Sequence, residues 1–301
     1  MAIAKLVLAE KFVTPAGGCS PLLLLEKNPP DLIRILRLLS GAAIVWDAAT
    51  EDCRYLGKTN FINRDHDVEA PGLDTILEYL FDERPEEAEL TAIFSRLASR
   101  NRGFYAEILE ELPFLLQSLD DENFAECFLY LYRLMERISV ACPLIFASRE
   151  NDFRGAHAFL ASMFDSKSAP GELGTLKKFL HRYSEKNNTF NLATLDFDVS
   201  GYDEEFSTEL FSQLRSNVVN ELNSVAIDDE RRTFSVPYKD VSSFVVSVRN
   251  RAFHNHSDRQ NFRLGRLGGA QALFGALVPS LLVWFAYVFV DFARWQIAGT
   301  S

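Results

Sequence analysis

Residues 267–290, close to the C-terminal end of this chain, contain no charged side chain. A run of this length can cross a bilayer as a single helix. It can equally form a helix that is buried on all sides at the centre of a helical domain. Gly, Gln, Pro and Ser dilute its first half, so only the segment SLLVWFAYVFV is strongly apolar. The pattern favours a buried core helix, and a tail-anchored membrane segment is the alternative.

Composition sets limits on the class of protein. Hydrophobic residues make up 48% and charged residues 24% of the 301 residues, which is typical of globular domains. A net charge of −11 argues against a protein that coats nucleic acid through bulk electrostatics, so any contact with nucleic acid requires a local basic site. The four cysteines lack metal-site spacing, and charged residues interrupt the apolar N-terminal stretch. We therefore expect free thiols, no signal peptide and a cytoplasmic location.

The chain is expected to be mainly α-helical and to have three parts. Residues 1–75 mix short extended and helical signals and predict a small mixed α/β region of unknown role. Residues 76–120 predict a helical connector, because apolar residues recur there at spacings of three and four. Residues 121–301 predict a helical bundle.

Two predicted helices in the bundle have well-defined apolar faces. In residues 121–148 the face consists of Phe124, Cys127, Phe128, Leu131, Leu134, Met135 and Ile138. We expect the acidic pair Asp120–Asp121 to lie at the start of this helix, where the helix dipole favours negative charge. The other helix is predicted to begin near Asp240 as its N-cap, and its face consists of Val241, Phe244, Val245, Val248 and Ala252.

The sequence SVRNRAFHNHSD, residues 247–258, gathers polar groups at the end of this second helix. Arg249 carries a permanent planar charge that can hold a phosphate in two places. His254 titrates near neutral pH and can transfer a proton, and Asn250 can orient it. Together these groups could cleave RNA without a metal. The alternative is structural, because Arg, Asn and His also bond the last carbonyls of a helix.

The pattern Arg-Asn-x-x-x-His at the end of a helix resembles the signature of the HEPN superfamily, whose name refers to higher eukaryotes and prokaryotes nucleotide-binding domains. Arg249, Asn250 and His254 match this signature residue by residue. The resemblance implies a C-terminal HEPN-like helical bundle and, in ribonuclease members, a homodimer in which two motifs form one metal-independent site. Glu136 more weakly resembles an acidic residue that some members carry on the first helix.

Arg251 and His256 repeat the spacing of Arg249 and His254, but Ala252 rather than Asn follows Arg251. We therefore expect Arg249, His254 and Asn250 to be catalytic. Arg251, His256 and Glu136 are expected to contact the substrate. Other basic residues that could hold RNA are Lys177, Lys178, Arg182, Arg231, Arg232, Arg259 and Arg263.

The favoured function is a metal-independent endoribonuclease that needs no cofactor and acts as an anti-phage defence or toxin-type effector. One alternative is a non-catalytic HEPN-like scaffold subunit of a multi-component defence complex; the other is the tail-anchored membrane protein. The segment RDHD at residues 64–67 could bind a metal, but a solvated loop is favoured because no second cluster accompanies it. Sequence signatures of ATPases, α/β-hydrolases and zinc proteases are absent.

Overall fold

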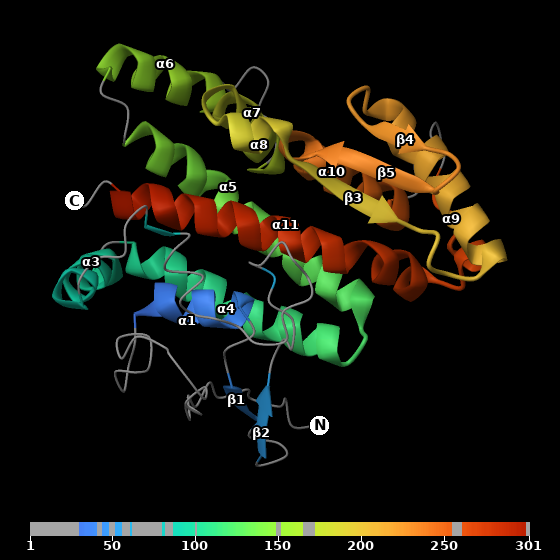
Figure 1. The fold of residues 1–301 in the computed structure, drawn as a ribbon, viewed down its shortest axis with the longest axis horizontal. Coiled ribbons are helices and arrows are strands. Elements are labelled where there is room, and N and C mark those ends of the chain that lie inside the picture. The colour runs from blue at the N-terminus through green and yellow to red at the C-terminus, as the bar shows by residue number, and fades with distance from the viewer. Residues whose placement is uncertain are drawn as a thin grey trace. The chain divides into compact units, whose positions relative to one another are not determined.

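The computed structural model is mainly helical, as the sequence predicts, with a small three-stranded antiparallel sheet (Figure 1). It describes residues 30–40, 44–47, 52–55, 61, 80–81, 87–99, 101–148, 152–164, 172–254 and 261–298. By its internal contacts the chain divides into two compact units. The first comprises residues 1–121 and 286–301, and the second comprises residues 122–285.

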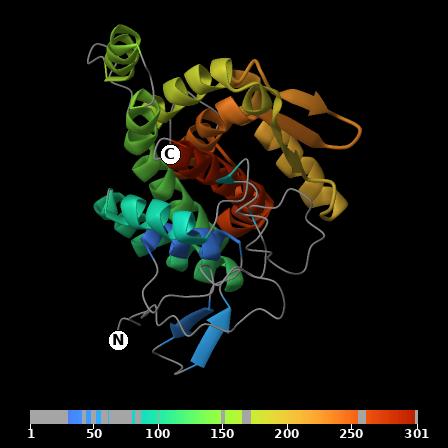
Figure 2. The same ribbon diagram turned by 60° about the vertical axis from the view of Figure 1, so that its left-hand side comes forward.

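The first unit contains a two-stranded hairpin and several helices. Its elements are α1 (Asp31–Leu39), β1 (Ile44–Asp47), β2 (Asp52–Tyr55), α3 (Glu87–Ser99), α4 (Arg102–Asp120) and the last part of α11 (Ala270–Ala298). Figure 2 shows β1 and β2 side by side, and Ile44 pairs with Tyr55 at one end of the antiparallel ladder. Helix α1 contacts α3 and α4. The Tyr105 hydroxyl on α4 bonds Gln296 on α11, and burial raises the pKa of Tyr105 well above its ordinary value.

The second unit contains the remaining elements. These are α5 (Phe124–Ala147), α6 (Phe153–Phe164), α7 (Glu172–Lys186), α8 (Asn188–Leu192), β3 (Thr194–Asp198), α9 (Glu204–Asn217), β4 (Ala226–Asp228), β5 (Thr233–Pro237), α10 (Val241–Phe253) and the first part of α11. The strands form one sheet in the order β3-β5-β4. Leu195 pairs with Val236, and Phe197 pairs with Phe234. These four side chains are buried, which is the alternation expected of a strand with one covered face.

Aromatic side chains form much of the core of the second unit. On one side of it, Phe146, Phe179, Tyr183 and Phe190 link α5, α7 and α8 through ring contacts. The sheet contributes two stacked pairs, in which ring centroids lie 4.7 Å apart for Phe197–Phe244 and 4.5 Å apart for Phe211–Phe234. The first of these pairs joins β3 to α10. The start of α10 is thereby fixed to the sheet.

The helix boundaries follow from local hydrogen bonds. The Asp203 side chain accepts a bond from Phe206 N at 3.0 Å and caps α9, and Asn187 does the same for α8 with Phe190 N.

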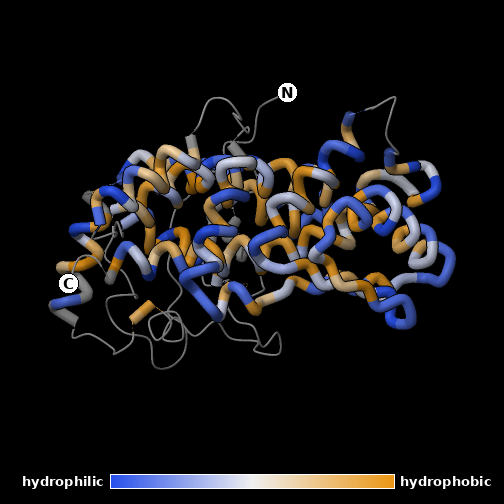
Figure 3. The backbone as a smooth tube through the Cα atoms, turned by 90° about the horizontal axis from the view of Figure 1, so that it is seen from above, coloured by the Kyte–Doolittle hydropathy of each residue, from blue (hydrophilic) through white to orange (hydrophobic). Residues whose placement is uncertain are grey.

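Hydrophobic and hydrophilic residues alternate along the helices in Figure 3. The predicted apolar face of residues 121–148 is confirmed, because its residues from Cys127 to Ile138 are at most 1% exposed.

Helix α11 contains residues 270–290 of the uncharged apolar run. Among the described residues it is the helix that is long and apolar enough to cross a membrane. Its most apolar window is 72% buried within the protein, which agrees with the interpretation as a core helix. The acidic pair Asp120–Asp121, in contrast, was assigned to the wrong helix end. Asp120 is the last residue of α4 and Asp121 follows it, whereas α5 begins at Phe124.

Candidate functional site

Helix α10 positions the predicted catalytic residues. Its apolar face is buried, with Val241, Phe244, Val245 and Val248 all 0% exposed. Burial of this face leaves Arg249 and Asn250 half-buried in the last turn. His254 is the C-cap, and its backbone N–H donates to the Asn250 carbonyl at 3.0 Å. The backbone of His254 is extended rather than helical, and its side chain is exposed.

The structure brings Arg249, Asn250 and His254 together. Arg249 Nη1 lies 2.6 Å from His254 Nε2 and donates to Asn250 Oδ1 at 3.1 Å. Because a guanidinium can only donate, His254 Nε2 must be the acceptor. A ring nitrogen that accepts a hydrogen bond can also accept a proton, which is what a general base requires. We refer to these two residues as the Arg249–His254 pair.

Tyr132 on α5 is a further contact of this pair. The centre of the Arg249 guanidinium lies 5.2 Å from the centroid of the Tyr132 ring, which is a cation–π distance. Sequence reasoning missed Tyr132, because its contact with α10 depends on how two distant helices pack. Glu136 is half-buried on the same face of α5, one turn beyond Tyr132. Its predicted role in substrate binding stays a prediction.

The Arg251 side chain points away from the Arg249–His254 pair. Its side chain is 5% exposed and forms an ion pair with Glu221, which precedes β4. Two residues along a helix turn the side chain by roughly 200°, so Arg249 and Arg251 lie on nearly opposite sides of α10. A contact between Arg251 and substrate stays a prediction. In the structure the Arg251 guanidinium is buried and forms an ion pair within the fold. The matching histidine, His256, lies outside the described residues.

Arg249 also differs from other arginines of the predicted RNA-binding set. Arg182, Arg231, Arg232 and Arg251 each pair with a carboxylate. Among the described residues, Arg249 makes no ion pair with a carboxylate, and its Nε and Nη2 make no hydrogen bond. Its side chain also bonds no helix carbonyl there, which argues against the capping interpretation of this arginine. Its charge is thus available to an anionic ligand.

Within the described ranges, no group of three or more His, Cys, Asp or Glu side chains is placed to hold a metal ion. The segment at residues 64–67 lies outside those ranges.

Comparison of the chain with protein-family models, with curated proteins and with solved structures finds no match.

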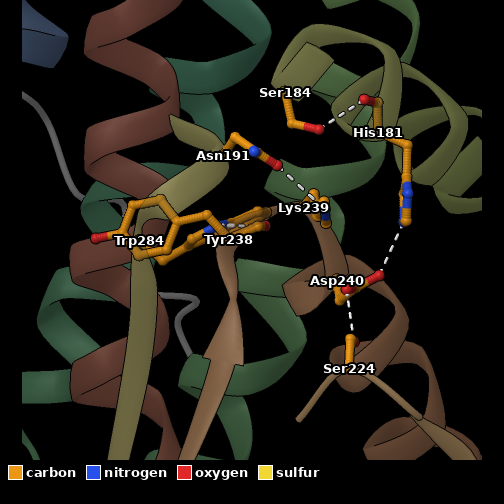
Figure 4. Close-up of polar contacts among 8 residues, drawn as sticks. All are labelled: His181, Ser184, Asn191, Ser224, Tyr238, Lys239, Asp240 and Trp284. Carbon is orange, nitrogen blue, oxygen red and sulfur yellow. Dashed lines mark hydrogen bonds and ion pairs between the residues drawn. The ribbon is translucent and has the colours of Figure 1, made fainter. Parts of the chain in front are cut away.

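A second polar group lies at the opposite end of α10 (Figure 4). Asp240, 6% exposed, accepts one bond from Ser224 at 2.6 Å and lies 2.8 Å from His181 Nε2 on α7. Burial by itself raises the pKa of this carboxyl. The hydrogen bonds from His181 and Ser224, together with the charges of His181 and Lys239, outweigh burial, so the pKa of Asp240 lies below its ordinary value.

Replacement of Asp240 by Asn should destabilise the protein in a pH-dependent way. A carboxyl with a lowered folded-state pKa stabilises the fold above its unfolded pKa of about 3.9, and this contribution is lost as pH falls through the folded value. We expect Asp240→Asn to lower the free energy of unfolding by about 1–2 kcal/mol at neutral pH, because bonds to a charged group are lost. Urea unfolding should show a much smaller difference once Asp240 is protonated. An equal loss at acidic and neutral pH would contradict this assignment.

Proposed function

We propose that this protein is a metal-independent endoribonuclease of the HEPN type that acts as a homodimer. The observation that carries the proposal is the 2.6 Å contact between Arg249 Nη1 and His254 Nε2. It joins a guanidinium that pairs with no carboxylate among the described residues to the accepting ring nitrogen of His254. This arrangement supplies a phosphate-binding group, Arg249, and a base, His254, within one short segment. Asn250 Oδ1 accepts a hydrogen bond from Arg249 and helps to hold its guanidinium in place.

The chemistry would begin when a phosphodiester displaces His254 from Arg249. Arg249 would donate to the non-bridging phosphate oxygens, because a charged oxygen is a stronger acceptor than a neutral imidazole. His254 Nε2 would then accept the proton of the ribose 2′-hydroxyl. The 2′-oxygen would bond to phosphorus while the bond from phosphorus to the 5′-oxygen breaks. Arg249 would stabilise the additional charge of the five-coordinate transition state.

The departing 5′-oxygen needs a proton, and one neutral histidine cannot supply it. In a homodimer, the protonated His254 of a second copy would donate this proton, so the two histidines would divide the roles of base and acid. A second Arg249 would also share the phosphate charge. The resemblance to the HEPN signature supports this composite arrangement.

The same resemblance supports a cytoplasmic anti-phage defence or toxin-type effector. Such an enzyme requires control, because free ribonuclease activity harms the cell that makes it. We assign that control to the first unit or to a regulatory partner in a defence complex. Helix α11, which contributes residues to both units, provides a covalent connection between that unit and the unit that contains α10.

The chemical ends of the RNA products test this mechanism. Attack by the 2′-hydroxyl leaves a 2′,3′-cyclic phosphate on one product and a 5′-hydroxyl on the other. We expect these ends when the purified protein cleaves RNA in the presence of EDTA, and no cleavage of the corresponding all-deoxy strand. Products with a 3′-hydroxyl and a 5′-phosphate, or cleavage that requires a divalent metal, would overturn the proposal.

A further inference from the structure

Phe253 occupies an unusual position for a large apolar side chain. It is the last residue of α10 and immediately precedes His254, yet its side chain is 54% exposed. Single exposed apolar residues are common on protein surfaces and need no explanation by themselves. The contacts of Phe253 and its place beside the Arg249–His254 pair distinguish it from such residues.

The covered part of the Phe253 ring rests on two buried rings. Its centroid lies 5.5 Å from that of Phe274 on α11, with an interplanar angle of 14°, and 6.5 Å from that of Phe128 on α5. Phe128 and Phe274 stack on each other at 4.3 Å and are at most 1% exposed. We call Phe253, Phe274 and Phe128 the aromatic platform.

The base of this platform is held by contacts between the first turns of α5 and α11. The Gln271 side chain accepts a bond from Ala125 N at 3.0 Å and donates to Asn123 Oδ1 at 2.7 Å. Gly275 lets the helices approach closely, because a Cβ at this position would lie 3.0 Å from the Phe124 ring. The exposed ring is therefore fixed in orientation before any ligand arrives, which lowers the entropy lost on binding.

We propose that Phe253 stacks on the nucleobase beside the scissile phosphate, and that the substrate is single-stranded RNA. This inference rests on the proposed function. Every nucleobase has a π-face, so an aromatic ring binds it without regard to sequence. The bases of a duplex already stack on one another, whereas those of single strands and loops are accessible. Since Phe253 and His254 are consecutive, a base on Phe253 would place its own phosphate near the pair.

The test measures binding separately from cleavage. The probe is a short single-stranded 2′-O-methyl oligouridylate that contains one 2-aminopurine, whose fluorescence is quenched on stacking and which offers no 2′-hydroxyl for attack. We expect wild-type protein to quench the probe. Phe253→Ala should abolish the quenching and weaken binding by about 10-fold, within the range found for base–aromatic stacking. Phe253→Trp should retain both effects.

Two further variants separate stacking from a general apolar contact. Phe253→Leu keeps an apolar side chain without a π-face and should behave like Phe253→Ala. Leu192→Ala removes a 72% exposed apolar residue from α8, in the same unit, and should bind like the wild type. Circular dichroism of all variants verifies that the fold is retained. Wild-type binding by Phe253→Leu, or an absence of quenching by the wild-type protein, would overturn the inference.

This test and the product analysis fail independently. Cleavage in EDTA together with unquenched probe would overturn the role of Phe253 and leave the endoribonuclease proposal intact. Quenching that depends on Phe253, without cleavage of RNA, would establish the binding platform and remove the catalytic function. A duplex carrying the same 2-aminopurine should bind at least 10-fold more weakly than the single strand, and equal affinity would overturn the substrate class.

Discussion

Replacement of His254 by Ala should lower the rate of RNA cleavage in EDTA by a factor of about 10²–10⁴, which is the usual contribution of a general acid or base. The effect should fall on the chemical step. In the proposed homodimer His254 serves as base in one copy and as acid in the other, so the variant removes both groups at once. Single-turnover cleavage of a labelled RNA measures this step directly.

The fold should survive this substitution. His254 is exposed and follows the last helical residue of α10, so its removal opens no cavity in the core. His157→Ala is the matched control, because His157 is also exposed and lies on α6, outside the Arg249–His254 pair. We expect His157→Ala to cleave at the wild-type rate. A His254→Ala protein that cleaves as fast as this control would remove His254 from the mechanism.

Replacement of Trp284 by Ala should lower the free energy of unfolding by about 3–5 kcal/mol, as is typical when a fully buried Trp is truncated. Trp284 on α11 is 0% exposed, and its indole Nε1 donates to the Tyr238 carbonyl at 3.1 Å (Figure 4). Tyr238 begins the short 3-10 turn that leads into α10. The loss therefore combines a cavity with the removal of one donor from a carbonyl that still accepts from Val241 N.

Trp284→Phe separates these two terms. It keeps most of the ring volume but cannot donate to Tyr238, so we expect a smaller loss of about 1–2 kcal/mol. Urea unfolding followed by circular dichroism measures both variants. A loss below about 1 kcal/mol for Trp284→Ala would show that this indole does not help to fix the start of α10, contrary to our account.

The long helices could be predicted because their periodicity is a local property of the sequence. The buried stripe of α5 and the buried face of α10 recur at three and four residues, and both were predicted residue by residue apart from half-buried positions at their ends. Helix α6 was not predicted. Among its described side chains α6 buries only Phe159 and Met163, and Phe153 is 88% exposed, so its apolar signal is weak.

Helix ends were harder to predict, because a capping residue has more than one possible partner. Asp240 occupies the predicted N-cap of α10, but its side chain makes no capping bond and instead contacts His181 and Ser224. His181 is 59 residues away in the sequence, so no local pattern reveals the contact. The assignment of Asp120–Asp121 to α5 was wrong for a related reason, since an acidic pair between two helices can belong to either.

The candidate site was partly predictable. Arg249, Asn250 and His254 belong to one segment. Because α10 ends at Phe253, directly before His254, their spacing alone predicts that they meet. Tyr132 and Phe274 come from other helices and depend on tertiary packing. The sequence already favoured Arg249 over Arg251, because Asn250 follows Arg249. The burial of Arg251 and its ion pair with Glu221 became visible only in the structure.

The most direct test of the central claim is the rate of RNA cleavage in EDTA by wild-type protein and by Arg249→Ala, measured side by side on one RNA. We expect cleavage by the wild type, and a rate lower by about 10²–10³ for Arg249→Ala, which is the effect of removing one donor to the transition-state charge. Arg249→Lys should recover only part of the rate, because an ammonium cannot bind phosphate in two places. Equal rates for the wild type and Arg249→Ala would contradict the account.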